Sequence, residues 1–465
     1  MTRFWIICLL VVVGVFSLKC DSRNVESDQR KPNILFILTD DQETGSLSEM
    51  PELQALLVEE GTTFENAFVT DPLCCPSRAT FLRGQYAHNH QISDNGPPLG
   101  GHEKFRELGL DRSTVATWLD EAGYETAYLG KYMNGYDDTT YVPPGWDEWF
   151  GWLGNYYSPA GEYRLNNNGR IETYNRLQIH DTDLLRKKAV SFLENRAGDD
   201  EPFFMWLATN APHPPAYVAK RHERMFSDSP LPSPPSFNEA DVSDKPKWLR
   251  RSNERLNESE VEVLERLYRR HLAALQSVDD TIGALVDTLD ETGQLDDTYI
   301  VFASDNGVFF GEHRLTKKGI AYEEAIRIPF VVRGPGVATQ RVDQLVVNND
   351  FAPTVADLAG VTPPDFVDGK SFAPLLRSGK PGLEEWRRGF LVEHYGPEYQ
   401  ALRTNEYAYI EWPNGDRELY DLEKDPYQLR SLHQTADPAL LEGFASRLDR
   451  LRNCSAEQCR TAETK

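Results

Sequence analysis

The chain has few positive charges, few cysteines and no apolar run long enough to cross a membrane. It carries 49 lysines and arginines against 73 aspartates and glutamates, a formal net charge of -24. This balance argues against a nucleic-acid-binding protein, because that function needs a basic surface. Internal repeats are also absent. With 465 residues, 40% of them hydrophobic, the chain can still bury a sizeable core in one large and one small domain.

The first 20 residues are typical of a secretory signal peptide. Arg3 precedes an apolar run that is short for a membrane span. Residues 21–31 are polar, and we interpret them as a linker. We therefore expect a secreted or periplasmic protein. Cys20 also fits a lipid-modified first residue of the mature chain, although Lys19 is a poor match to the small residue expected there; attachment to a membrane through Cys20 is thus an alternative.

Cys8 and Cys20 belong to this leader, and the other four of the six cysteines fall into two pairs. Cys454 and Cys459 are close enough to form a disulfide through a small loop in an oxidising compartment. Cys74 and Cys75 are adjacent, and a zinc site is one interpretation of them. Zinc needs about four nitrogen or sulfur ligands, and no further cysteine pair lies nearby. We expect Cys75 to be buried.

The most informative stretch of the sequence is residues 71–84, which read DPLCCPSRATFLRG. Pro76 followed by an apolar run predicts a helix that begins close to Cys74. Unpaired N–H groups and the helix dipole at that end would stabilise a thiolate and an anionic substrate. Arg78 adds a fixed positive charge. A buried structural cysteine remains the alternative interpretation.

Two predicted strands each end in oxygen-bearing side chains. Residues 33–39 form a continuous apolar run followed by Asp40 and Asp41, and residues 299–303 form another followed by Asp305 and Asn306. Ligands collect beyond the carboxyl ends of parallel strands. Carboxylate and amide oxygens select Ca²⁺ or Mg²⁺ over softer metals. Caps or turns explain one such pair, but two pairs favour a metal site.

The stretch around Cys74 closely resembles the signature of formylglycine-dependent sulfatases. The match covers PLCCPSR at residues 72–78 and FLRG at residues 81–84. In that family the first cysteine of C-x-P-S-R is oxidised to formylglycine by a formylglycine-generating enzyme. The resemblance therefore implies that this enzyme is a maturation partner, that Cys74 carries the chemistry and that Cys75 fills the variable position.

The resemblance extends to the metal and to the cationic side chains. It implies that Ca²⁺, with Mg²⁺ as an alternative, is bound by Asp40, Asp41, Asp305, Asn306 and the converted Cys74. It also implies a catalytic set of Cys74, Arg78, Lys131, His213 and Lys318. One departure is Met133, which stands where the commonest family pattern has histidine; a general-base role for that histidine cannot be transferred.

Three further residues are candidates for substrate contact. His88 and His90 follow the signature helix, although surface imidazoles explain them as well. Asn134 lies three residues after Lys131 and could take over part of a polar contact.

Alternating strands and helices predict a mostly parallel sheet covered on both faces. The resemblance specifies the alkaline-phosphatase-like α/β fold of sulfatases, with a catalytic domain at residues 32–380. Residues 258–293 have the spacing of a long helix. Short alternating runs and a helix at 438–452 predict a small antiparallel sheet with a covering helix in a C-terminal subdomain, residues 381–465.

Several segments are informative about the branch of the family: CCPSR at 74–78, YAHNH at 86–90, GKYMNGY at 130–136, PPGWDEW at 143–149, APHPP at 211–215 and SVDDTIGALVDTLDETGQL at 277–295. They most resemble the N-acetylglucosamine-6-sulfatase and heparan endosulfatase branch. This implies a sulfuric ester hydrolase acting on a sulfated sugar or polysaccharide. One hydroxyl of hydrated formylglycine would attack sulfur and release the sugar alcohol, and the second would then expel sulfate. The alternatives are a phosphomonoesterase or phosphodiesterase of the same superfamily, a non-catalytic protein that binds sulfated glycans, and a zinc-binding structural protein.

Overall fold

The computed structural model describes residues 1, 31–137, 139–154, 161–252, 254–378, 386–396 and 398–465. Lys31–Lys465 form one unit. The expected signal peptide, nearly all of the linker and Cys20 lie outside the described residues. Among the helices that are described, none has the length and apolar character needed to cross a membrane.

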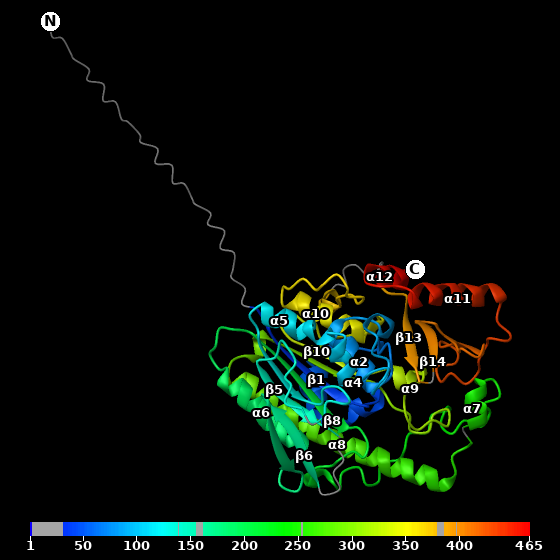
Figure 1. Cartoon of the computed structure of the whole chain (residues 1–465), viewed down its shortest axis with the longest axis horizontal. Coiled ribbons are helices and arrows are strands. Elements are labelled where there is room, and N and C mark those ends of the chain that lie inside the picture. Colours follow the sequence, from blue (N-terminus) through cyan, green and yellow to red (C-terminus); the bar gives the residue numbers. More distant parts are fainter. Residues whose placement is uncertain (2–30, 138, 155–160, 253, 379–385, 397) are drawn as a thin grey trace. The chain divides into compact units, whose positions relative to one another are not determined.

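Ten strands of the described chain form the main sheet, in the order β11-β2-β10-β9-β1-β8-β4-β5-β6-β7 (Figure 1). Strands β9, β1, β8, β4 and β5 are parallel neighbours in its centre, and antiparallel pairs lie towards both sides. The strands are β1 (Asn33–Asp40), β2 (Thr62–Phe64), β4 (Glu125–Gly130), β5 (Glu148–Leu153), β6 (Glu162–Asn167), β7 (Arg170–Asn175), β8 (Phe203–Pro212), β9 (Thr298–Ser304), β10 (Phe330–Arg333) and β11 (Gln340–Val342). β3 (Ala67–Phe68) and β12 (Val346–Val347) form a separate parallel pair.

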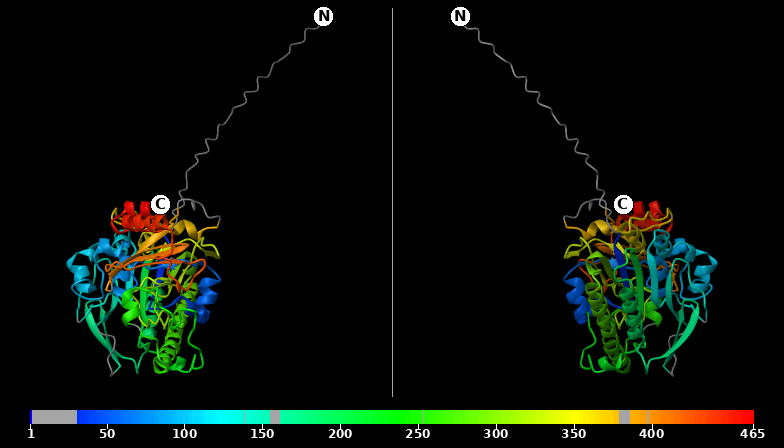
Figure 2. Two further views of the ribbon diagram at one scale, coloured as in Figure 1. Left: turned by 90° about the vertical axis from the view of Figure 1, so that its right-hand side faces the viewer. Right: turned by 90° about the vertical axis from the view of Figure 1, so that its left-hand side faces the viewer.

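Helices cover both faces of the sheet, as the two side views in Figure 2 show. Side chains of β1 alternate between two cores. Leu35 and Ile37 belong to the core beneath α6 (Asp181–Asn195) and α8 (Glu258–Glu291). Phe36 belongs to the core beneath α2 (Cys74–Arg83), α5 (Val115–Glu121) and α10 (Phe351–Leu358). The Phe36 ring lies 4.0 Å from the ring of Phe351, centroid to centroid. Burial on both faces explains why the central strands read as continuous apolar runs.

The described α-helices of this part of the chain include one of 34 residues, α8, within the range predicted from its spacing. They are α1 (Pro51–Leu53), α2 (Cys74–Arg83), α3 (Ala87–His90), α4 (Gly101–Glu107), α5 (Val115–Glu121), α6 (Asp181–Asn195), α7 (Lys247–Ser252), α8 (Glu258–Glu291), α9 (Glu323–Ile326) and α10 (Phe351–Leu358).

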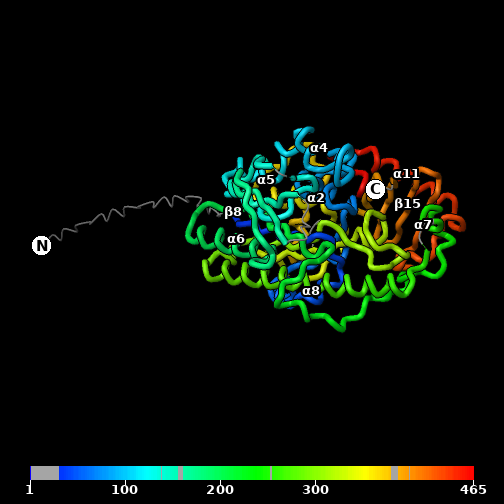
Figure 3. Tube along the Cα trace, turned by 60° about the horizontal axis from the view of Figure 1, so that its bottom comes forward, coloured from blue at the N-terminus to red at the C-terminus, as the bar shows by residue number. Residues whose placement is uncertain are grey.

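A second, antiparallel sheet of four strands follows in the C-terminal segment, coloured orange in Figure 3. Its strands are β13 (Gly389–Tyr395), β14 (Glu398–Thr404), β15 (Tyr407–Glu411) and β16 (Arg417–Asp421). Helix α11 (Pro438–Arg452) packs against this sheet and is followed by α12 (Glu457–Thr464). A disulfide joins Cys454 and Cys459 between the two helices, which confirms the predicted pair. The predicted domain boundary at residue 380 falls outside the described residues and stays a prediction.

Candidate active site

Helix α2 begins at Cys74, where the sequence predicted a helix start. The preceding Leu73 is extended, and Gly84 ends the helix with a φ of 68°, in the left-handed region that favours glycine. Every residue of α2 is buried, and Cys74 is 1% exposed. The amide of Asn348 donates to Ser77 Oγ at 3.0 Å, which ties the first turn to the body of the protein.

The tips of β1 and β9 bring the predicted metal ligands together. These strands are parallel, with Thr39 opposite Ser304, so the residues that follow them meet. The backbone N–H of Asp41 donates to Asp305 Oδ1 at 3.1 Å, and Asn306 Nδ2 donates to Asp41 Oδ1 at 2.6 Å. Two segments that are 264 residues apart in the sequence therefore form one acidic site.

Cys74 lies at this acidic site, with Sγ 3.5 Å from Asp40 Oδ1. Arg78, from the same helix, donates through Nε to Asp305 Oδ2 at 2.8 Å. Its Nη1 donates to the backbone oxygen of Lys131 at 2.6 Å, so the guanidinium also holds the loop after β4. The signature helix thus contributes both the buried Cys74 and a buried cation.

Two lysines and a histidine complete the cluster. Lys131 forms an ion pair with Asp40, and Lys318 forms one with Asp41. Lys318 Nζ also lies 2.8 Å from Cys74 Sγ. His213 Nε2 is 3.6 Å from Asp41 Oδ2. All five predicted catalytic residues and all predicted metal ligands are therefore brought together.

Gly130 fixes the approach of the Lys131 loop. Its φ is 108°, and a Cβ atom there would lie 1.9 Å from the backbone oxygen of Ala208. That close approach lets the backbone N–H of Lys131 donate to Ala208 O at 2.9 Å. A side chain at position 130 would push Lys131 away from Asp40.

The donor set fits a divalent cation. The ligand atoms of Asp40, Asp41, Cys74 and His213 lie within 4.8 Å of one another. Asn306 Oδ1 is buried and has no hydrogen-bond partner among the described residues, so it is an acceptor that a cation would satisfy. Most of these donors are oxygens, which suits a hard cation. The cluster could therefore hold a metal.

Burial and charge set the ionisation of the site. Burial raises the pKa of the Cys74 thiol to about 11, despite the opposing charges of Lys131 and Lys318. The expected stabilisation of a thiolate by the helix terminus is therefore outweighed. Burial alone would raise the pKa of Asp40, but Lys131 and His213 hold it well below its usual range. Burial and the neighbouring Asp40 raise the pKa of Asp305.

His88 and His90 do not join the cluster, and their predicted contact with substrate stays a prediction. His88 Nδ1 lies 2.8 Å from Glu393 Oε1, and His88 Nε2 lies 2.9 Å from the backbone oxygen of Cys454. His90 is fully buried and uses both ring nitrogens in contacts within its own segment, with Thr80 and the backbone of Ile92. Because their ring nitrogens are engaged inside the protein, these histidines stabilise the fold.

Asn134 keeps a polar atom available beside the signature helix. Its Oδ1 is buried and has no hydrogen-bond partner among the described residues, and its backbone oxygen accepts from the N–H of His102 at 2.8 Å. The predicted contact with substrate stays a prediction.

Sequence reasoning missed two groups that support the site. Asn95 Oδ1 accepts from the backbone N–H of Cys75 at 2.9 Å. His394, from β13, lies 2.8 Å from Asp71, three residues before Cys74. Asp71 was visible as the first residue of the signature stretch, but no local signal identified its partner more than 300 residues later.

Comparison with known families shows to which family this chain belongs. A family model described as Sulfatase matches residues 32–361. The chain belongs to the sulfatase family. A second family model, described as N-sulphoglucosamine sulphohydrolase, C-terminal, matches residues 311–453, which include the four-stranded sheet of this sulfatase-family chain. The family predicted from the signature is thus confirmed.

Named relatives of this family member include three animal sulfatases. The N-acetylglucosamine-6-sulfatase of Homo sapiens is 33% identical over 94% of this chain and 87% of its own length. The putative extracellular sulfatase Sulf-1 homolog of Caenorhabditis elegans is 36% identical, and the extracellular sulfatase SULF-1 homolog of Drosophila melanogaster is 35% identical. The chain spans only 55% and 38% of the lengths of these two extracellular relatives.

Solved structures confirm the fold predicted for this sulfatase-family chain. A protein in complex with its substrate D-glucosamine-2-N,6-O-disulfate superposes with a TM-score of 0.79 at 25% identity, covering 93% of this chain and 99% of that one. The phosphonate monoester hydrolase of Agrobacterium radiobacter superposes with a TM-score of 0.70 at 22% identity, covering 90% and 95%. Since both share the fold, the fold alone does not choose between sulfate and phosphonate esters.

Proposed function

We propose that this protein is a sulfuric ester hydrolase that releases inorganic sulfate from a sulfated saccharide, with 6-O-sulfated glucosamine or N-acetylglucosamine as the reacting unit. The observation that carries the proposal is the position of Cys74, at a helix start between the acidic tips of β1 and β9 and 2.8 Å from the ammonium group of Lys318. The human relative named N-acetylglucosamine-6-sulfatase and the neighbour that binds a glucosamine disulfate support the choice of sugar.

The cofactors of the proposal are Ca²⁺ and a formylglycine made from Cys74 by a formylglycine-generating enzyme. Asp40, Asp41, Asp305 and Asn306 would hold the ion together with the converted side chain. When bound, the ion would lower the pKa of the attacking hydroxyl that the hydrated aldehyde supplies. Mg²⁺ is the alternative ion, since it also prefers oxygen donors.

In this proposal, cationic side chains of the site position the sulfate group and one of them donates a proton. Lys131, Lys318 and Arg78 carry three positive charges around the reacting position, so they would bind the sulfuryl oxygens as negative charge spreads over them. His213 Nε2 or Lys318 Nζ would donate a proton to the departing sugar oxygen. Because these cations act at close range, they outweigh the repulsion from a distant net negative charge, which salt screens beyond about 10 Å.

We place this activity outside the cytoplasm. The Cys454–Cys459 disulfide supports an oxidising compartment, and the two extracellular sulfatase relatives support the same location. Lipid attachment through Cys20 remains the alternative form of the same proposal.

The test is sulfate release from a panel of defined saccharides. The panel contains glucosamine 6-sulfate, glucosamine 2-N-sulfate and glucosamine 6-phosphate, each with the wild-type protein and a Cys74→Ala variant. We expect repeated turnover of the 6-sulfate, little turnover of the 6-phosphate and none with Cys74→Ala. Faster phosphate release would favour the phosphomonoesterase alternative. Binding of the sulfated sugars without turnover, by a protein whose Cys74 is converted, would favour the glycan-binding alternative.

A further inference from the structure

One buried histidine of the C-terminal sheet contacts the two segments that lie beside Cys74. His394 is on β13 and is 3% exposed. Its Nδ1 lies 2.8 Å from Asp71 Oδ1, and its Nε2 lies 3.0 Å from the backbone oxygen of Gly396. Both partners are acceptors, and a protonated ring has a donor on each nitrogen, so it can bond both at once. These two contacts fix the orientation of the ring.

The same ring lies against the backbone of Gly319, the residue after Lys318. A Cβ atom at Gly319 would lie 3.2 Å from His394 Nε2 and 3.7 Å from His394 Cδ2. The φ of Gly319 is 89°, which also favours glycine. Because no side chain stands between them, the chain at Gly319 packs directly on the imidazole of His394.

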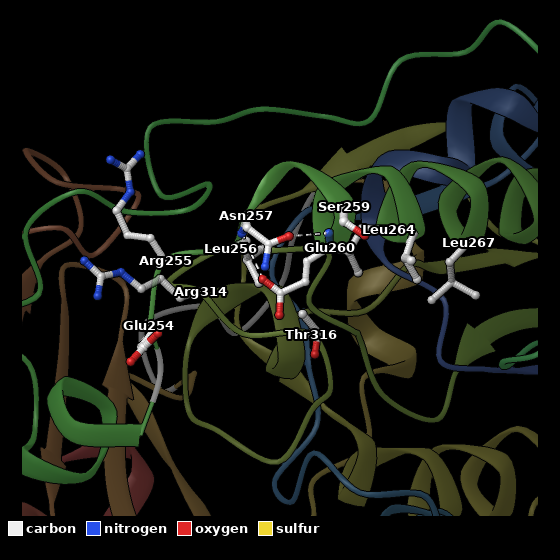
Figure 4. A pocket seen from close by; sticks show the side chains of 11 residues that line it. Glu254, Arg255, Leu256, Asn257, Ser259, Glu260, Leu264, Leu267, Arg314 and Thr316 are labelled. Atoms are coloured by element: carbon white, nitrogen blue, oxygen red, sulfur yellow. Dashed lines mark hydrogen bonds between the residues drawn. The ribbon is translucent and has the colours of Figure 1, made fainter.

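The loop that precedes Lys318 does not by itself fix the position of this lysine. The N–H of Phe309 donates to the backbone oxygen of Lys317 at 2.8 Å, which closes the loop. Thr316, on the loop, lines a groove of about 700 Å³ at the start of α8 (Figure 4). Within the described part of the chain, the backbone of residues 318–321 makes no hydrogen bond. Packing contacts therefore decide where the Lys318 ammonium group lies.

At its other edge the ring is tied to the turn that leads into Cys74. Asp71 is fully buried, and its backbone oxygen accepts from the N–H of Leu73 at 2.9 Å, directly before α2 begins. Strand β13 is joined to the same turn, because the N–H of Glu393 donates to the backbone oxygen of Thr70 at 2.9 Å. The C-terminal sheet and the start of the signature helix are therefore held together.

We infer that His394 is a positioning residue of the active site. Its ring, held by Asp71 on one side and packed on Gly319 on the other, sets the place of Lys318 Nζ, which lies 2.8 Å from Cys74 Sγ. A misplacement of about 1 Å can lower a rate 10²-fold, so this support matters for turnover. The inference rests on the proposed function, because Lys318 would act there on the sulfuryl group. It gives the C-terminal sheet a part in the active site.

The test is a double-mutant cycle between His394 and Lys318. The amide of His394→Asn can still donate to Asp71, but its shorter side chain leaves space beside Gly319. The assay measures kcat for sulfate release from glucosamine 6-sulfate, after a peptide mass shows equal conversion of Cys74. We expect His394→Asn to lower kcat by about 10- to 100-fold in the wild-type background. In the Lys318→Met background the loss should be less than about twofold, because no ammonium group is left to position.

Two controls separate positioning from a general loss of structure. In a Lys131→Met background the loss caused by His394→Asn should persist, since Lys131 lies on another loop. His433→Asn is the matched substitution in the C-terminal segment, where the ring Nδ1 lies 2.9 Å from Ser431 Oγ, and it should leave kcat unchanged. If His394→Asn does not fold, His394→Gln, which keeps more of the ring's volume, takes its place. Equal losses in the wild-type and Lys318→Met backgrounds, or no loss in either, would overturn the inference.

If the wild-type protein releases no sulfate, the proposed function fails and geometry alone tests the inference. Crystal structures of the wild type and of the His394 variant then give the distance from Lys318 Nζ to the side chain at position 74. A lengthening of about 1 Å or more in the variant supports the positioning role. An unchanged distance overturns it.

Discussion

Replacing Lys318 by methionine is expected to lower kcat for sulfate release by about 10²- to 10³-fold, the usual effect of losing one charge-stabilising donor. Lys318 Nζ lies 2.8 Å from Cys74 Sγ and pairs with Asp41, so it is the ammonium group in direct contact with the reacting position. The lost donor corresponds to about 2.7–4 kcal/mol of transition-state stabilisation. Methionine has a similar length and cannot donate, so the cavity left behind is small.

The control is the neighbouring residue. Lys317 is exposed, and its backbone oxygen accepts from Phe309, so Lys317→Met keeps the loop but changes only a solvent-exposed side chain. Because Asp41 keeps its 2.6 Å bond from Asn306 in Lys318→Met, the fold should survive, which the melting temperature checks. Sulfate release is measured on glucosamine 6-sulfate, after a peptide mass confirms that Cys74 is converted equally in all proteins. The reasoning is refuted if Lys318→Met keeps more than about a tenth of the wild-type kcat, or if Lys317→Met loses as much.

Three further predictions concern the metal, pH and the disulfide. Chelation should abolish sulfate release and Ca²⁺ should restore it; recovery with Zn²⁺ alone would contradict an oxygen-rich site. Burial lowers the pKa of His88, but the hydrogen bond and charge of Glu393, the hydrogen bond to the Cys454 backbone and the charge of Asp368 together raise it to about 9. The protonated ring therefore stabilises the fold fully below pH 6.5 and less as the pH rises through 9. The difference in unfolding free energy between wild type and His88→Gln, measured with urea, should shrink by about 3 kcal/mol from pH 6 to 10. A constant difference would contradict the ion pair. Replacing Cys454 and Cys459 by alanine should lower that free energy by about 2 kcal/mol, because the closed loop is short, and an unchanged midpoint and slope would show that the disulfide does not contribute.

The position of the acidic cluster could be predicted because its side chains follow strands that are buried on both faces. The apolar runs that end at Asp40 and before Asp305 are readable without a structure, and parallel strands must bring their carboxyl ends to one edge. Helix α11 was equally readable, since Pro438 opens an amphipathic segment that ends at Arg452 as predicted.

Other features of the fold and the site could not be predicted, because they depend on contacts between segments that are distant in the sequence. Strands β6 and β7 form an antiparallel extension that the sequence did not predict, because β7 is largely exposed or half-buried and lacks a buried apolar run. His88 is another case: whether its ring meets a substrate or a carboxylate is decided by Glu393, which is 305 residues later. Pairing of this kind is a tertiary property, and a local pattern does not encode it.

The most direct test of the account is turnover by two neighbouring cysteine variants. Cys74 and Cys75 are both buried free cysteines, but only Cys74 lies at 2.8 Å from Lys318. We predict that Cys74→Ala releases no sulfate from glucosamine 6-sulfate, whereas Cys75→Ala, once its conversion at Cys74 is verified, turns over repeatedly. Sustained sulfate release by a folded Cys74→Ala protein would contradict the central claim.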